Sequence, residues 1–237
     1  MRHRGTRGHL ATDEAHLEAI AERWRAETHC EPPVSGAEEL WIAGVRVIPD
    51  AARAAGRACL DGGVVYYHPG WPPDVVNFAL LHELGHLLAQ RDRCDGEAAA
   101  SYVAAALAMP RAQVLRVVRR VGRDIPMVRW AFGDSVSHEV VGRRLVDVYP
   151  ELVLSVWPEG RLLVRYERGI AAPLSVTERD AVAQGVTAGE PGWRDDIGAG
   201  AWVVEERRGR VTYVLVDREQ LDSRGARAAY DEAVGEG

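Results

Sequence analysis

Two histidines and a glutamate stand close together in the segment FALLHELGHLLAQ, which spans residues 78–90. His82 and His86 are four residues apart, so on a helix their imidazoles lie on one face and reach a single ion together. Glu83 directly follows His82 and presents its carboxylate to a ligand of that ion. The alternative is that both histidines belong to the core and hydrogen-bond to backbone carbonyls. The spacing H-E-x-x-H favours a divalent-metal site with a general base beside it.

The element that carries these residues is predicted to be a core-packed helix, because apolar residues recur mostly at spacings of three and four from Val75 to Leu88. A hydrolytic zinc site needs three protein ligands and one open position for water, so a third ligand must come from elsewhere. An alanine-rich helix is predicted from Glu97 to Pro110, and a helix hairpin would fold Glu97 back over the histidines. We favour Glu97 over three candidates in the connection: Asp92, Cys94 and Asp95.

Short strands are predicted before the metal helix, at residues 45–48, 57–60 and 64–68. Asp61-Gly62-Gly63 is predicted to form the hairpin turn between the last two strands. A strand edge beside the metal of a zinc peptidase can hold an extended substrate by main-chain pairing. Val64 and Val65, in the strand just before the helix, are the candidates for that edge, with an ordinary core strand as the alternative.

The chemistry of such a site follows from the ion and the base. Zn²⁺ held by His82, His86 and Glu97 would lower the pKa of a bound water, and Glu83 would take its proton during attack on a scissile carbonyl. Ser101, four residues after Glu97, either hydrogen-bonds a ligating histidine or is a small residue that lets helices pack closely. Two histidines and one carboxylate can also bind Mn²⁺ or Fe²⁺. Three residues are candidates to stabilise the oxyanion, with simple packing as the alternative for each: Tyr66, Tyr67 and His68.

A longer pattern extends the metal motif. HELGH is followed, eleven residues after its second histidine, by E-x-x-A-[N/S]-x-x-A-A-x-L-x-M-P. This pattern resembles the ImmA/IrrE family of zinc metallopeptidases over about residues 10–110. The resemblance implies zinc ligands at His82, His86 and Glu97 and a general base at Glu83. The chain departs from the family pattern at three positions, where the family more often has Asn, Phe and Leu: Ser101, Val103 and Ala108.

The resemblance also implies a function. Members of this family cleave Cro-like helix-turn-helix repressors and so derepress stress-response or mobile-element genes, which makes a regulatory zinc endopeptidase the first hypothesis. The alternative is a metal-dependent transcriptional regulator or DNA-binding sensor with a structural zinc site. Glu83 favours the peptidase, because a structural zinc site has no use for a general base beside it.

We expect an α+β fold that consists of three regions. Residues 1–110 would form a zincin-like metallopeptidase domain. Residues 152–166 and 200–217 are each predicted to form two strands around a glycine-containing turn, and a polar helix is predicted around residues 224–233. Residues 151–237 would therefore form a small α+β domain. Some relatives carry a GAF-type sensor domain there, although no motif in these residues names a ligand. Residues 111–150 are rich in arginine and contain WAFGDSVSHEVVGRRL, which resembles a helix-turn-helix. We favour a helical bundle with a basic face over a DNA reader, since the net charge of the chain is −6.

The composition is typical of a globular protein and is consistent with an enzyme. The chain has 237 residues, of which 47% are hydrophobic and 27% charged. It has no apolar run of about 20 residues and no apolar segment after its basic start, so we expect a cytoplasmic protein that does not enter the membrane. Its three cysteines lack C-x-x-C spacing, which is consistent with reduced thiols.

Overall fold

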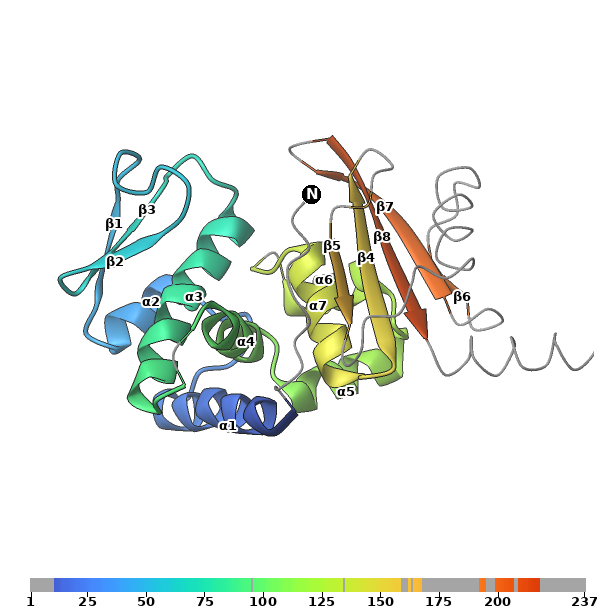
Figure 1. Cartoon of the computed structure of the whole chain (residues 1–237), viewed down its shortest axis with the longest axis horizontal. Helices are drawn as coiled ribbons and strands as arrows, with labels where there is room; N and C mark the ends of the chain where they lie inside the picture. Colours follow the sequence, from blue (N-terminus) through green and yellow to red (C-terminus); the bar gives the residue numbers. More distant parts are fainter. Residues whose placement is uncertain are drawn as a thin grey trace, which may run out of the picture.

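The protein has a mixed α+β fold (Figure 1). The computed structural model describes residues 11–94, 96–133, 135–158, 162, 164–167, 192–194, 199–206 and 209–217. These residues form seven helices and two sheets, one of three strands and one of five. Within them, no helix combines the length and apolar character that a membrane span requires.

Four helices build the part of the fold that carries the histidines. They are α1 (Ala11–Thr28), α2 (Gly36–Ile42), α3 (Pro73–Arg91) and α4 (Glu97–Ala108). α3 packs along α4, α1 lies against α4, and α2 lies against α3. α4 is buried almost throughout, because its small alanines let neighbouring helices approach on several sides. The predicted helix hairpin is therefore present, with α3 and α4 as its two arms.

The first sheet lies beside α3 and contains β1 (Arg46–Pro49), β2 (Cys59–Asp61) and β3 (Val64–Tyr67). Gly62 and Gly63 both have positive φ and form the hairpin turn, whereas Asp61, which the sequence predicts in that turn, is the last residue of β2 and pairs with Val64. The strand order is β1-β3-β2, with β1 parallel and β2 antiparallel to β3. β3 is thus the central strand, and the prediction that Val64 and Val65 offer a substrate-binding edge is wrong. Their main-chain groups are directed to neighbouring strands on both sides, and β2 is an edge instead.

The middle segment forms three helices, α5 (Arg111–Val121), α6 (Ile125–Phe132) and α7 (His138–Val148). Asp124 and Ser137 cap the N-termini of α6 and α7 through their side-chain oxygens. Every residue of α7 is buried or half-buried. The helix that would read DNA in a helix-turn-helix is therefore part of the core.

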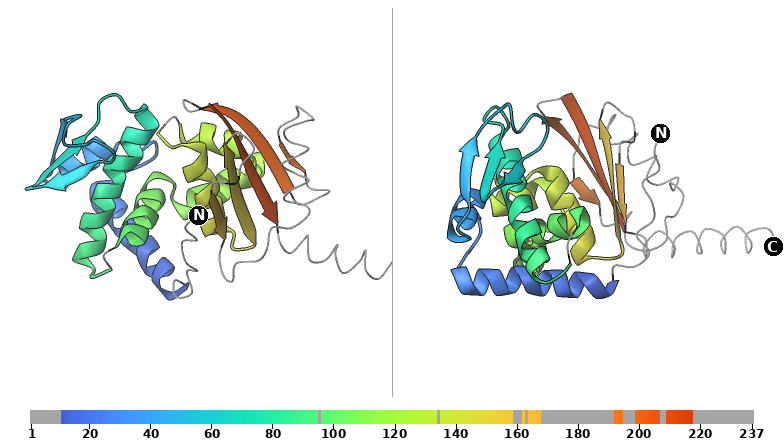
Figure 2. Two further views of the ribbon diagram at one scale, coloured as in Figure 1. Left: turned by 45° about the horizontal axis from the view of Figure 1, so that its top comes forward. Right: turned by 60° about the vertical axis from the view of Figure 1, so that its left-hand side comes forward.

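The second sheet consists of β4 (Leu152–Pro158), β5 (Val164–Glu167), β6 (Gly192–Arg194), β7 (Ala199–Glu206) and β8 (Gly209–Asp217). Its strand order is β5-β4-β8-β7-β6 and every pairing is antiparallel. α7 covers one face of this sheet through β4, β5 and β8 (Figure 2). Four of these strands match the predicted alternation, whereas β6 was not predicted. The helix predicted around residues 224–233 lies outside the described residues.

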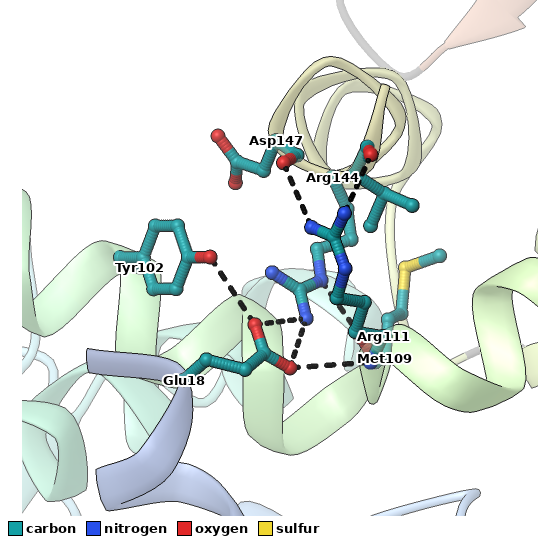
Figure 3. Close-up of polar contacts among 7 residues, drawn as sticks. Glu18, Tyr102, Met109, Arg111, Arg144 and Asp147 are labelled. Carbon is teal, nitrogen blue, oxygen red and sulfur yellow. Dashed lines mark hydrogen bonds and ion pairs between the residues drawn. The ribbon is translucent and has the colours of Figure 1, made fainter. Parts of the chain in front are cut away.

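A continuous hydrophobic core joins the helices to the second sheet. A buried polar network crosses it (Figure 3). Arg144 of α7 donates to both carboxylate oxygens of Glu18 in α1, and Tyr102 of α4 donates to the same carboxylate. The backbone N–H of Arg111 donates to it as well. This network ties α1, α4, α5 and α7 together at one point.

Candidate metal centre

His82, His86 and Glu97 come together at the crossing of α3 and α4. The Nε2 atom of His82 lies 3.2 Å from Oε2 of Glu97, and Nε2 of His86 lies 3.8 Å from Oε1 of the same carboxylate. The two imidazole centroids are 4.7 Å apart, with the rings perpendicular. The Glu97 side chain is 77% exposed, whereas His82 and His86 are 20% and 26% exposed. The three groups therefore meet at the surface, where an ion has access to them.

The donor set fits a zinc ion. One ligand atom from each of the three residues can be chosen so that all lie within 4.8 Å of one another. Tetrahedral zinc with ligands at about 2.0–2.2 Å separates ligand atoms by roughly 3.3–3.6 Å, close to the two nitrogen–oxygen separations found here. Three protein ligands at the protein surface also match a site that keeps one position for water.

The close approach of α3 and α4 depends on Gly85, which lies between the two histidines. A Cβ atom at this position would overlap the backbone carbonyl of Ala100 in α4. Because backbone atoms cannot rotate away as a side chain can, any larger residue would push the two helices apart. Gly85 thus allows the helix contact that brings Glu97 within reach of the histidines.

Glu83 lies on the same helix and is half-buried. Burial raises the pKa of its carboxyl above the ordinary value, against the opposing charges of His86 and Arg57 and a hydrogen bond from the backbone of Leu60. The Leu60 contact shows that edge strand β2 lies against this carboxylate. A carboxylate with a raised pKa next to a metal triad is suited to accept a proton and to give it up again.

Ser101 lies one helical turn after Glu97, and its Oγ is 3.2 Å from Nδ1 of His82. The structure thus places it where an outer hydrogen bond would orient this imidazole, with Nε2 turned towards Glu97. Burial, together with the charges of His86 and Arg143, lowers the pKa of His82. A lowered pKa favours the neutral imidazole, which is the form that binds metal ions.

The oxyanion candidates in and after β3 differ in where they lie. Tyr66 is under the guanidinium of Arg53, on the face of the sheet opposite Val65 and Tyr67, so the structure does not bring it to the triad. His68 is held in its own loop, since its Nδ1 accepts from the backbone N–H of Gly70 and its ring stacks on Trp71. Tyr67 packs partly buried against the core, on the face of the sheet that carries Val65.

Two of the three competing third ligands, Asp92 and Cys94, contact other groups in the structure. Asp92 forms an ion pair with Arg23 of α1, and His16 lies 3.8 Å from the same carboxylate. The thiol of Cys94 donates to the backbone carbonyl of Asp92. Asp95 lies outside the described residues. The helix hairpin, rather than the connection, supplies the carboxylate beside the histidines.

Loss of Glu97 is expected to remove the metal. Glu97→Ala leaves only the two histidines. Loss of an outer hydrogen bond to a ligand already lowers metal affinity by about tenfold to a hundredfold, so we expect loss of Glu97 itself to lower the zinc affinity further. Elemental analysis should find about one zinc per wild-type chain, as a three-ligand site predicts, and little in the variant. Asp92→Ala is the matched control, because it removes a nearby carboxylate that pairs with Arg23. Equal zinc in Glu97→Ala and wild type would exclude Glu97 as a ligand.

Sequence reasoning missed three residues around this site: Arg57, Leu60 and Arg143. Leu60 acts through its backbone and Arg57 through its charge on Glu83, so neither belongs to a motif. Arg143 is 61 residues along the chain from His82, on which its charge acts. Residues 111–150 are rich in arginine, but composition alone does not distinguish one arginine from the others.

Comparisons with known proteins support the fold alone. No family model and no curated protein sequence matches this chain. Among solved structures, a Mycobacterium tuberculosis transcriptional regulator has a similar fold, with a TM-score of 0.59 and 15% sequence identity. The likeness covers 89% of this chain and 93% of that one, so it includes both the helical part and the second sheet.

Proposed function

We propose that this chain is a zinc-dependent endopeptidase of the ImmA/IrrE type, with a zincin-like core. The observation that supports this most is the meeting of His82, His86 and Glu97 beside Glu83. A structural zinc site would normally be closed by a fourth protein ligand, whereas these three ligands are accessible at the surface. The Glu83 carboxylate would then act as the general base, because hydrolysis needs a base for the attacking water.

Each residue has a distinct role in the proposed reaction. Zn²⁺, when bound, would supply a Lewis acid that polarises the scissile carbonyl and lowers the pKa of water. Glu83 takes a proton from the attacking water and passes it to the leaving amine. Ser101 holds the imidazole of His82 in the orientation needed for ligation.

The edge strand β2 is suited to bind the substrate. Leu60, in the middle of β2, hydrogen-bonds to Glu83, so this strand borders the proposed base. Among the described residues β2 pairs with β3 on one side only, so its other edge can form main-chain hydrogen bonds through the groups that are not directed to Glu83. An extended peptide added to that edge would run past Glu83 and the triad. This role replaces the one first expected for Val64 and Val65.

The proposed substrate is a small Cro-like helix-turn-helix repressor, whose cleavage would derepress stress-response or mobile-element genes. The test is incubation of the zinc-loaded chain with such repressors and mass spectrometry of the products. We expect defined fragments that disappear with a chelator and return when zinc is restored. Persistence of the fragments after chelation would contradict metal-dependent hydrolysis.

A metal-dependent transcriptional regulator is the second candidate. The similar fold of the Mycobacterium tuberculosis transcriptional regulator favours it. Two observations weigh against direct DNA reading: α7 is buried, and several arginines of the middle segment are engaged within the protein. Arg123 pairs with Glu151 and Asp217, and Arg129 donates to a backbone carbonyl. Salt-dependent binding of duplex DNA, without peptide cleavage, would favour this candidate.

A further inference from the structure

The first sheet has a second edge, formed by β1 on the side away from β2. The backbone N–H of Arg46 donates to the carbonyl of Gly63, and the N–H of Asp50 donates to the last residue of β3. β1 therefore pairs with β3 through alternate residues, and the N–H and C=O of Val47, which lies between them, point out from the free edge. Among the described residues, no further backbone group bonds to them there. Val47 thus offers one donor and one acceptor to another strand.

The usable part of this edge is short. Pro49 has no N–H, and the N–H of Val45 already donates to the carbonyl of Leu40. A long peptide strand would therefore find few partners here, whereas β1 of a second copy of this chain needs only Val47. Two residues that face each other in antiparallel strands exchange both of their hydrogen bonds. With Val47 of each copy in these two positions, the copies are related by a twofold axis, the commonest symmetry of protein dimers.

Exposed apolar side chains gather beside this edge. Trp41 is 76% exposed, its neighbour Ile42 is 47% exposed, and Ile48 of β1 is 36% exposed. α2 and β1 border a groove that is lined by Ala37, Trp41, Val45, Arg46, Val47 and Ile48. Large apolar side chains that cluster around an open strand edge are typical of a surface that another protein chain covers.

The charges on β1 are complementary under the same twofold axis. Arg46 and Asp50 are four residues apart, so their side chains lie on one face of the strand. With Val47 facing Val47, Arg46 stands opposite Ile48 of the second copy and diagonal to its Asp50, a spacing that a long side chain spans. No described carboxylate lies within ion-pair distance of Arg46. Asp50 uses Oδ1 for backbone N–H groups of its own loop, and its Oδ2 is 3.9 Å from Arg53, so it can accept a further donor.

We infer that two copies of this chain pair through β1, with Val47 of each copy facing Val47 of the other across a twofold axis. The two three-stranded sheets then form one continuous sheet in the order β2-β3-β1-β1-β3-β2. Trp41 and Ile48 of each copy are covered, and Arg46 pairs with Asp50 twice, once on each side of the axis. Both β2 strands stay at the outer ends of this sheet, so the pairing leaves the proposed substrate edge accessible.

Sedimentation equilibrium of the full chain between about 1 µM and about 1 mM tests this pairing, since a small interface gives a weak dimer. We expect the mass to rise from one chain to two and to stop there, because a twofold contact is closed. Trp41→Lys places a charge in the covered groove and should raise the dissociation constant at least about tenfold. Arg46→Glu should raise it as well, because it sets a like charge against Asp50 of the second copy.

Trp130→Lys and Arg120→Glu are the matched controls, because they make the same kinds of change at exposed positions of α6 and α5. Both should dimerise like wild type, and circular dichroism checks that every variant keeps its fold. A wild type that stays monomeric at the highest concentration, or that grows beyond two chains, would overturn the pairing. An unchanged dissociation constant in a folded Trp41→Lys or Arg46→Glu variant would overturn it too, as would equal weakening by the controls.

Discussion

Glu83→Gln is expected to lower the rate of peptide-bond hydrolysis by roughly 10²–10⁴-fold while leaving zinc binding intact. Glutamine has nearly the same shape as glutamate but cannot accept a proton at neutral pH. Glu83 is not one of the three residues of the candidate metal centre, so the variant keeps His82, His86 and Glu97 unchanged. The rate is measured by mass spectrometry of repressor cleavage, with zinc content determined on the same samples.

Asp61→Asn is the matched control for this variant. Asp61 ends β2, close in sequence to Leu60, and its exposed carboxylate lies 3.8 Å from Arg53. Its removal changes charge near the site without touching the proposed base, so we expect cleavage within about threefold of wild type, since exposed ion pairs contribute little. Unchanged cleavage by Glu83→Gln would remove Glu83 from the mechanism. Loss of zinc from Glu83→Gln would show instead that its carboxylate supports the metal.

The second large effect is expected at the buried ion pair between Glu18 and Arg144. Arg144 is fully buried, and its Nη2 atom lies 2.7 Å from both carboxylate oxygens of Glu18. Glu18→Gln leaves a buried guanidinium without its counter-charge and weakens the acceptor for Tyr102 and for the backbone N–H of Arg111. We expect the free energy of unfolding to fall by about 3–5 kcal/mol, the usual cost of breaking one partner of a buried pair.

Urea unfolding followed by circular dichroism measures this change. Glu31→Gln is the matched control, because Glu31 pairs with Arg25 but is 78% exposed, and the expected loss is below about 1 kcal/mol. The double variant Glu18→Gln/Arg144→Met should be less unstable than the sum of its single variants, since it leaves no unpaired buried charge. Equal losses in Glu18→Gln and Glu31→Gln would mean that the pair contributes no more than a surface contact.

The ion pair also bears on the metal centre. Tyr102 follows Ser101 on α4, and Arg144 follows Arg143 on α7. The network therefore holds α4, the helix that carries Glu97 and Ser101, against α7. Arg144 also donates from Nε to the carbonyl of Met109, just after the end of α4. The buried network of Glu18, Tyr102 and Arg144 thus holds α4 and α7 in their relative positions, which local sequence preferences do not determine.

The sequence by itself determined the features that depend on neighbouring residues. A period near 3.6 placed His82, Glu83 and His86 on one helix, and Asp61-Gly62-Gly63 indicated the hairpin of β2 and β3, although Asp61 belongs to β2. Alternation in residues 152–217 indicated four of the five strands of the second sheet. These features are encoded locally, because backbone geometry relates residues three or four apart on a helix and two apart on a strand.

Only the tertiary structure decided what depends on contacts between distant residues. The sequence favoured Glu97 over Asp92, but only the approach of α3 to α4 at Gly85 brings Glu97 to the histidines, while Asp92 pairs with Arg23 of α1. The order β1-β3-β2 moved the candidate substrate edge from β3 to β2. Glu18 and Arg144 meet across 126 residues, and Arg143 acts on a histidine of another helix. The reason is physical: periodicity specifies which face of an element is apolar, whereas partner and register depend on how all the faces pack together.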